Sequence, residues 1–170
     1  MEADKTTTKR VSKGKSIEQY CLYLLGRREY SRSELYRKAL KKFKNSCEYV
    51  EGESLESAVE SVLDGLSEKG WLSDTRFCEC YLRSQSEKGY GFKRIAYELE
   101  QKGVKASVVS SVEETLGIDW QANLERQMHR KYPFTKIPGA KSLDPKEKAV
   151  IVRFFQYRGH DLHDILSLLN

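Results

Sequence analysis

Residues 88–104 read KGYGFKRIAYELEQKGV, and this stretch decides between two kinds of protein. Its two glycines could open a phosphate-binding loop, or they could turn the backbone between two helices. A dinucleotide-binding fingerprint needs a third glycine at the position of Arg94 and a preceding β-strand, and a P-loop needs a Gly-Lys-Ser/Thr ending. The stretch has none of these features. It therefore predicts a sharp turn between helices, with Tyr90 or Phe92 covering the junction.

Apolar residues recur at helical spacing in this stretch and along most of the chain. Ile95 and Leu99 lie on one face of the quoted helix, and the stripes before and after it follow the same rule. Ser31–Glu34 has the S-x-x-E pattern of a capping box, and Asp144 before Pro145 is a strong helix start. No run alternates as a half-buried strand would. The sequence therefore predicts an all-α protein.

Glycines mark the places where these helices should end. Gly70, Gly103 and Gly159 each follow an apolar stripe and can adopt the left-handed conformation that ends a helix. Gly89 and Gly91 are expected to shape the turn within the quoted stretch. In a Schellman ending, the residue after the glycine contacts one in the last turn of the helix. The pairs in question are Trp71 with Leu66, Val104 with Leu99, and His160 with Phe155.

The chain also contains an internal repeat. Residues 92–116 overlay residues 147–170 with apolar positions and a glycine in step, and a segment starting at Gly117 matches one starting at Gly70. Such repeats build an elongated, curved array that binds other macromolecules along a face. Residues 1–15, rich in Lys, Arg, Thr and Ser, predict a disordered basic arm. Three copies of a three-helix unit fit, spanning residues 16–70, 71–116 and 117–170.

The net charge is +5, from 30 Lys and Arg against 25 Asp and Glu, and it is arranged in blocks. Residues 25–45 and 126–148 are basic, whereas residues 46–74 are acidic. Alternating blocks suit docking onto a partner of mixed charge, and an ordinary solvated helical surface would carry them too. No apolar run is long enough for a membrane span, and a secretory signal is not evident. The four cysteines are therefore expected to be reduced thiols of a cytoplasmic protein.

Few residues could support catalysis or metal binding. His160 and His163 share an H-D-L-H-D run, but no further His or Cys lies nearby in sequence to complete a metal site. Asp161 is better explained as the cap of the last helix. Cys78 and Cys80 point to different faces of one helix, and Cys80 is expected in the core. We therefore expect no enzymatic activity, no cofactor and no metal.

A basic surface remains around the quoted turn. Clustered cations are what phosphate binding requires, and each neutralised phosphate makes the affinity fall with salt. Each cation taken singly could equally belong to a solvated face. Lys88, Lys93 and Arg94 flank the Gly-Tyr-Gly turn. The cations that lie off the apolar stripes are Arg94 and, in neighbouring helices, Arg83, Arg130 and Lys131.

Residues 62–104 resemble the RecX family of bacterial regulatory proteins. The family pattern combines a Gly-Trp/Tyr turn, an aromatic residue after Arg, a Lys-Gly-Tyr-Gly turn, Arg-Ile, and Leu-x-x-Lys-Gly-Val/Ile. Phe92 stands where many members have proline, and the resemblance weakens over residues 117–170. The matching segments are Gly70 to Asp74, Arg76-Phe77, Lys88 to Gly91, Arg94-Ile95 and Leu99 to Val104.

The resemblance implies three tandem three-helix modules, in agreement with the repeat. It also implies a partner, the RecA recombinase, especially its filament on single-stranded DNA, and inhibition of recombination, ATP hydrolysis and coprotease activity. The family has no catalytic residues to transfer. The resemblance makes Arg76, Arg83, Lys88 and Arg94 contact candidates, although any of them could instead brace the turn between modules.

A second hypothesis is a direct DNA-binding module. Small three-helix units with a basic helix often read the major groove, and contact with a filament can include contact with its DNA. Under either hypothesis we expect a monomer that does not enter a membrane.

Overall fold

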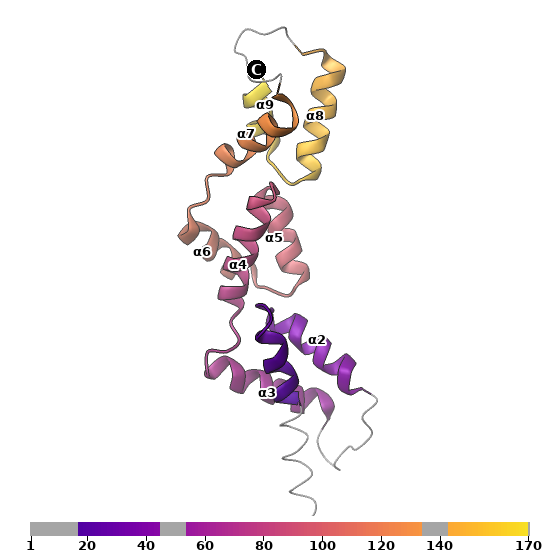
Figure 1. Ribbon diagram of the computed structural model, residues 1–170, viewed down its shortest axis with the longest axis vertical. Helices are drawn as coiled ribbons and strands as arrows, with labels where there is room; N and C mark the ends of the chain where they lie inside the picture. Colours follow the sequence, from indigo (N-terminus) through magenta and orange to yellow (C-terminus); the bar gives the residue numbers. More distant parts are fainter. Residues whose placement is uncertain (1–16, 45–53, 134–142, 170) are drawn as a thin grey trace, which may run out of the picture. The chain divides into compact units, whose positions relative to one another are not determined.

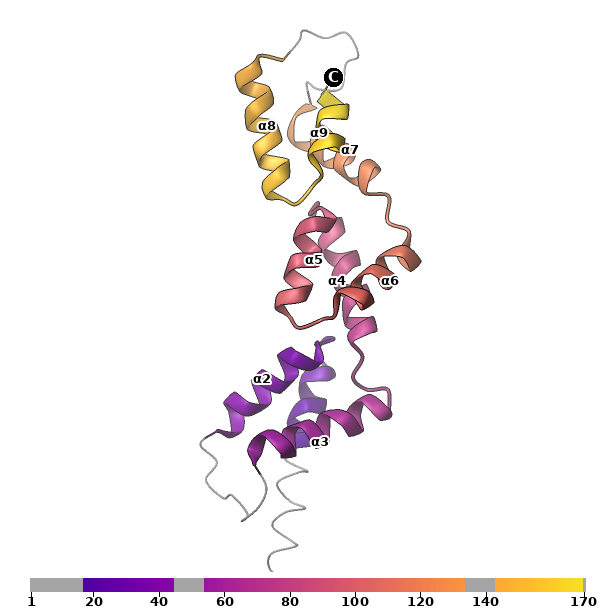
Figure 2. The same cartoon turned by 180° about the vertical axis from the view of Figure 1, so that it is seen from behind.

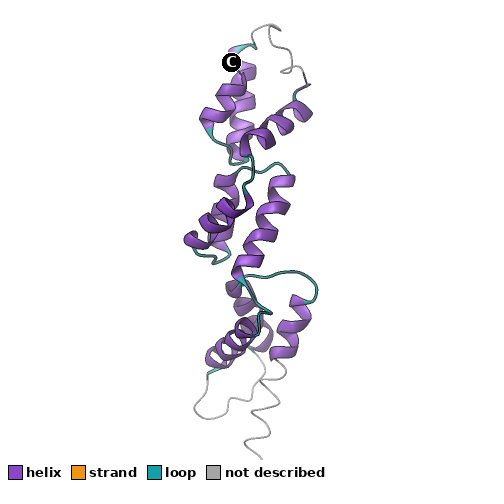
Figure 3. Cartoon of the chain, turned by 90° about the vertical axis from the view of Figure 1, so that its left-hand side faces the viewer, coloured by secondary structure: helices purple, strands orange, loops and turns teal. Residues whose placement is uncertain are grey.

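The computed structural model describes residues 17–44, 54–133 and 143–169, and every regular element within these ranges is a helix (Figure 3). The all-α prediction is therefore confirmed for the described residues. The basic arm predicted at residues 1–15 lies outside them. No helix in these ranges has the length and apolar character needed to cross a membrane.

Unit 1, the first of two compact units, comprises the described residues up to Phe77 together with Lys102–Val104. It contains a helical segment over residues 17–25, α2 (Arg32–Phe43) and α3 (Leu55–Glu68), and α2 packs along α3 (Figure 1). Their apolar stripes meet in one core, where each large side chain contributes roughly 1.5–3 kcal/mol through burial. The fully buried members include Ile17, Cys21, Leu35, Ala39, Val59 and Leu63.

Unit 2 comprises Cys78–Gln101 and the residues from Lys105 onward. Viewed from behind, its last three helices lie side by side (Figure 2). They enclose a core of Leu124, Met128, Ile151, Phe155, Ile165 and Leu169. The helices of this part of the chain are α4 (Asp74–Glu87), whose first turn belongs to unit 1, α5 (Phe92–Gln101), α6 (Ala106–Leu116), α7 (Trp120–Lys131), α8 (Pro145–Tyr157) and α9 (Leu162–Leu169).

Left-handed glycines end the helices, as predicted for Gly70, Gly103 and Gly159. After α3, the Trp71 amide donates to the Leu66 carbonyl at 2.9 Å, which is the bond of a Schellman ending. The same bond follows α8. These endings satisfy carbonyl groups that the helix itself leaves unpaired. The described glycines with positive φ are Gly70, Gly89, Gly103, Gly117 and Gly159.

One local prediction, on the cysteines of α4, is wrong, and a second, the capping box of α2, is confirmed for Ser31 but not for Glu34. Cys80 is exposed and Cys78 is buried, because the inward stripe of α4 runs through Cys78 and the position four residues later. Ser31 does cap α2, accepting a hydrogen bond from the Glu34 amide at 3.1 Å. The Glu34 carboxylate, however, pairs with Lys102 at 2.8 Å, a contact that the helix sequence alone cannot reveal.

Within unit 1, the turn that follows α5 lies against the beginning of α2. Ser31 Oγ donates to the Lys102 carbonyl at 2.6 Å, and the Arg32 amide donates to Asp74 Oδ1 at 2.8 Å. A methyl group on Gly103 would lie 2.4 Å from the nearest side-chain atom of α2, so only glycine fits. The first amides of a helix have no intrahelical partners. Here residues distant in sequence supply one of those partners and fix the helix start.

Within unit 2, the turn that follows α8 lies against the beginning of α5 in the same way. The Gly91 amide donates to the Arg158 carbonyl at 2.8 Å. A methyl group on Gly91 would lie 2.3 Å from the Gly159 carbonyl oxygen, and one on Gly159 would lie 2.4 Å from Arg94 Cβ. The φ angle of Gly91 is not positive. Gly91 therefore permits a close approach of two backbones, whereas the sequence suggested a residue that shapes the turn itself.

We predict that Gly91→Ala lowers the free energy of unfolding by about 1–3 kcal/mol, because the added methyl group meets backbone atoms that cannot move aside. Gly65→Ala is the matched control, because the same methyl group on Gly65 in α3 would meet nothing within 4 Å. The control should raise stability by about 0.5–1 kcal/mol through helix propensity. Urea unfolding measures both, and an unchanged Gly91→Ala midpoint would contradict the close approach.

Candidate functional site

The Lys-Gly-Tyr-Gly turn places Tyr90 beside two arginines. The guanidinium carbons of Arg94 and Arg158 lie 4.4 Å and 4.6 Å from the centroid of the Tyr90 ring. Phe92 packs against Trp120, with ring centroids 5.7 Å apart. Cation–π contacts of this kind are worth about 0.5–1 kcal/mol each when exposed and more when shielded from water. The turn is therefore held by its aromatic residues.

The side chain of Arg158 binds the backbone of the same turn. Its Nε donates to the Gly89 carbonyl at 3.0 Å, and its Nη2 donates to the Lys88 carbonyl. A planar guanidinium presents its donors as a fork, which suits two adjacent carbonyls. Sequence reasoning missed Arg158. The signal that could have found it is its position directly before the glycine that ends α8, because Lys102 holds the same position after α5.

Cations and aromatic rings alternate across this part of unit 2. Arg94 also lies 5.4 Å from the Tyr157 ring, Arg158 lies 5.5 Å from the Phe154 ring, and Lys131 lies 4.2 Å from that same ring. The Lys131 ammonium also lies 5.8 Å from the centroid of the Tyr132 ring. The series forms a cation–aromatic ladder, which fixes charged groups at the surface. In order, the ladder is Tyr157, Arg94, Tyr90, Arg158, Phe154, Lys131 and Tyr132.

Several predicted contact residues are engaged in ion pairs. Lys93 pairs with Asp161, and Arg94 Nε donates to Glu98 at 2.9 Å. This hydrogen bond to Glu98 is the main reason why the pKa of Arg94 is raised above its usual value. The Lys93–Asp161 pair is exposed and contributes little net free energy, so Lys93 can exchange its carboxylate for a partner's anion at small cost. The Arg94–Glu98 pair is half-buried and holds Arg94 in place.

The other predicted cations of unit 2 differ in their surroundings. Arg83 pairs with Glu79 one turn earlier on α4, at 3.1 Å. Lys131 belongs to the ladder, and the Lys88 carbonyl accepts a hydrogen bond from Arg158, another member of it. Arg130 is exposed near the end of α7. The structure thus joins the side chains of Arg94 and Lys131 and the backbone carbonyl of Lys88 in one set of contacts.

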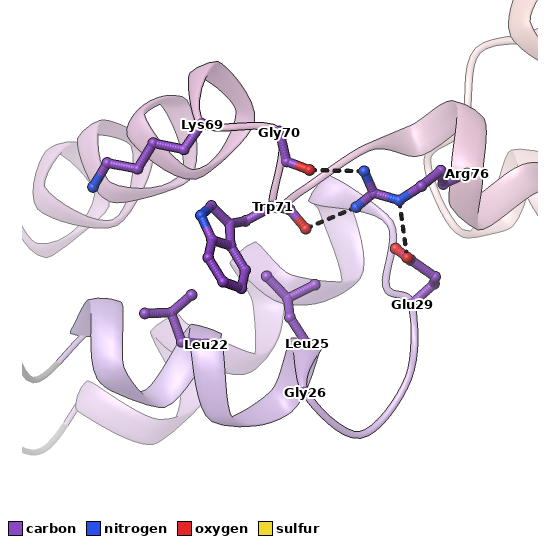
Figure 4. A pocket seen from close by; sticks show the side chains of 8 residues that line it. All are labelled: Leu22, Leu25, Gly26, Glu29, Lys69, Gly70, Trp71 and Arg76. Carbon is purple, nitrogen blue, oxygen red and sulfur yellow. Dashed lines mark hydrogen bonds and ion pairs between the residues drawn. The ribbon is translucent and has the colours of Figure 1, made fainter.

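Arg76 braces a turn in unit 1. Its guanidinium donates to the carbonyls of Gly70 and Trp71 at 2.7 Å and 2.9 Å, and to the Glu29 carboxylate at 2.9 Å (Figure 4). All three guanidinium nitrogens therefore have partners inside unit 1. The bracing role left open by the sequence is the one that the geometry supports.

Beside this brace, Trp71 borders a pocket of about 500 Å³. Leu22 and Leu25 contribute the rest of its apolar lining, and the Trp71 side chain is 58% exposed (Figure 4). Exposed tryptophans on a rigid turn are frequent at protein-binding surfaces. Lys69 lies at the edge and pairs with Glu18 at 3.0 Å.

The two histidines considered for metal binding have different surroundings. His160 is buried with its Nε2 at 3.1 Å from the Gly89 carbonyl oxygen, and burial lowers its pKa below the ordinary value. The exposed His163 donates its amide to Asp161 Oδ1 at 2.9 Å, which confirms Asp161 as the cap of α9. A hydrogen bond from Lys93 holds the pKa of Asp161 below its usual range. Over the described ranges, no group of three His, Cys, Asp or Glu could hold a metal ion.

Comparison with known sequences finds similar proteins over most of the chain. Residues 73–112 match the model of the second three-helix domain of RecX. The regulatory protein RecX of Pseudomonas fluorescens (strain SBW25) is 34% identical over 155 residues, which cover 91% of this chain and 90% of that protein. The regulatory protein RecX of Pseudomonas putida (strain W619) is 32% identical over the same shares.

Solved structures give a consistent result for the fold. The crystal structure of RecX from Lactobacillus salivarius has a TM-score of 0.67 at 17% identity, covering 95% of this chain and 96% of that chain. A further crystal structure of regulatory protein RecX has a TM-score of 0.72 at 16% identity, covering 99% of this chain and 78% of that chain. At these identities the likeness establishes a shared fold.

We predict that Arg76→Gln lowers the free energy of unfolding by about 1–2 kcal/mol, because two carbonyls and the Glu29 carboxylate lose their donor. Arg83→Gln removes the same charge and breaks only an exposed pair on one helix, so its loss should stay below about 0.5 kcal/mol. Urea denaturation of both variants measures the difference. Equal losses would show that Arg76 is an ordinary surface cation.

We predict that His160 makes the protein less stable at acid pH. Because its folded pKa is lowered from 6.5, the unfolded chain binds more protons below that pH, and stability falls as the pH drops. His160→Gln keeps an amide donor toward Gly89, and its free energy of unfolding should fall less than that of the wild type between about pH 7.5 and about pH 5.5. His163→Gln is the control and should keep the wild-type pH dependence. A His160→Gln profile that matches the wild type would exclude this role.

Proposed function

The chain belongs to the RecX family of regulatory proteins, and on that premise we propose that its partner is the RecA recombinase. The partner form would be the RecA filament on single-stranded DNA, and the effect would be to inhibit recombination, ATP hydrolysis and coprotease activity. The observation that carries the proposal is identity of about a third with regulatory RecX proteins over nearly the whole chain. The protein would act as a cytoplasmic monomer without a cofactor.

The chemistry of the ladder supports binding as the task of this surface. Its charged groups are guanidinium and ammonium ions held against aromatic rings, which recognise anions and flat apolar groups. Lys88, Lys93, Arg94, Arg130 and Lys131 are the proposed contact residues of unit 2. Arg83 remains a weaker candidate because it pairs on its own helix, and Arg76 is assigned to bracing.

The repeat organisation is part of the same proposal. The contact between a turn and a helix start occurs once at Ser31 with Lys102 and again at Gly91 with Arg158. The recurrence of this contact at two equivalent positions supports three related units over residues 16–70, 71–116 and 117–170.

Direct DNA binding is the second candidate, and one observation favours it. Helix α2 exposes Arg37, Lys38, Lys41 and Lys42 in unit 1, and Arg28 lies 3.7 Å from the ring centroid of Tyr30 beside it. A basic helix in a small three-helix unit is suited to phosphate contacts and to the major groove. Naked duplex DNA should then be bound with a preference for base sequence. Equal affinity for any polyanion would argue against this candidate.

The RecA proposal is tested by adding the purified chain to RecA on single-stranded DNA and measuring ATP hydrolysis and strand exchange. We expect both to slow at ratios up to equimolar. The Lys88→Glu/Arg94→Glu double variant should need at least about tenfold more protein, because two cations of the surface reverse sign. Lys105→Glu/Arg153→Glu is the control with the same change of charge at other exposed sites, and it should behave as the wild type.

Two outcomes would contradict the proposal in different ways. If the wild-type chain leaves both reactions unchanged at every ratio, RecA is not the partner. If the wild type inhibits and both double variants inhibit equally well, the partner is right and the contact residues are wrong. Circular dichroism of each variant shows whether its helices are intact.

A further inference from the structure

Beyond the predicted cations, Tyr157 is an exposed aromatic residue at the end of the ladder. Its side chain is 79% exposed, the largest value among the exposed large apolar residues of the described chain. It lies at the last position of α8, next to Arg158 and over Arg94. We propose that Tyr157, Arg94, Tyr90 and Arg158 form a protein-binding hot spot, called here the Tyr157 patch. The inference rests on the proposed function and assigns this patch to the partner protein itself, not to its DNA.

The two arginines of the patch are held in place before any partner arrives. Arg94 is fixed by Glu98 and by the Tyr90 ring, and Arg158 is fixed by the carbonyls of Lys88 and Gly89. Binding to such a surface loses little side-chain freedom, which is a large part of the cost of association. Tyrosine and arginine are also two of the three residue types enriched among the residues that dominate binding energy.

The charges of the patch favour a protein partner over a nucleic acid strand. Arg94 and Lys93 are accompanied by the carboxylates of Glu98 and Asp161, which would lie close to any phosphate bound here. A strand needs several uncompensated cations along its path, and each added carboxylate weakens that attraction.

The aromatic rings lead to the same conclusion. Nucleic acid strands bind by stacking successive bases on exposed rings. The Tyr90 ring is already covered by two guanidinium groups, so a base could stack there only by displacing an arginine. Tyr157 alone is a single stacking site, which does not make a path for a strand.

The same geometry defines the chemistry of the partner surface. The exposed ring of Tyr157 can bury a flat or aliphatic side chain. Glu98 uses the Nε donor of Arg94, and a guanidinium carries further N–H donors on its other nitrogens. The patch therefore fits a partner surface that carries an apolar side chain with a carboxylate beside it.

The test compares Tyr157→Ala with Tyr97→Ala, because Tyr97 on α5 is also well exposed, at 62%. Affinity is measured by fluorescence anisotropy in two titrations, one with RecA protein free of DNA and one with a labelled oligo-dT strand. Tyr157→Ala should weaken RecA binding by at least about tenfold, as expected for a hot-spot tyrosine. It should change oligo-dT affinity by less than about twofold. Tyr97→Ala should match the wild type in both titrations.

Each other outcome overturns the inference. Loss of oligo-dT affinity without loss of RecA affinity would make Tyr157 a nucleic acid contact. If Tyr157→Ala and the wild type bind RecA with equal affinity, the patch is not a hot spot. In that case the proposed function still holds as long as the wild type inhibits RecA. Absence of binding between the wild type and DNA-free RecA would overturn this inference, whereas the ATP hydrolysis and strand-exchange assays on single-stranded DNA decide the proposed function separately.

Discussion

The close contact between a glycine turn and the start of a neighbouring helix joins distant parts of the chain in each of the two units. At Gly103 and at Gly159 there is no room for a side chain, because the turn lies directly against α2 or α5. The contact also supplies hydrogen-bond partners for backbone or capping groups at each helix start, where intrahelical partners are lacking. A bulkier residue would separate the elements and remove these bonds together. Packing and hydrogen bonding are thus coupled at the same few residues.

Arginine and lysine serve two different purposes in this molecule. Arg76 and Arg158 direct their guanidinium donors at carbonyl groups of turns, so their charge is spent on holding the backbone. Lys93 instead meets the Asp161 carboxylate at an exposed site, where water competes for both partners, whereas Arg94 meets Glu98 in a half-buried pair. Only an exposed pair such as Lys93–Asp161 can exchange partners at small cost. A net positive charge therefore overstates the cationic surface that is available for recognition.

A binding role agrees with this difference between cations that hold turns and cations that pair with carboxylates. The ladder shows how charged groups can be kept in place at a surface without a deep cavity, because stacking a cation between two rings restricts its motion. The turn–helix contact in unit 2 and the proposed binding surface share Arg94 and Arg158. The proposal therefore links the integrity of the fold to the capacity to bind.

The helices, their glycine ends and the family could all be predicted from the order of the residues. Apolar spacing and the glycines are local signals, and the motifs from Gly70 to Val104 are contiguous enough to be recognised. The bracing role of Arg76 and the importance of Arg158 could not be read in this way, nor could the burial of Cys78 in place of Cys80. These features follow from the folded arrangement, because each depends on which distant backbone or side chain comes within about 3–5 Å, the range of a hydrogen bond or a cation–π contact. Local sequence spacing carries no information on that distance.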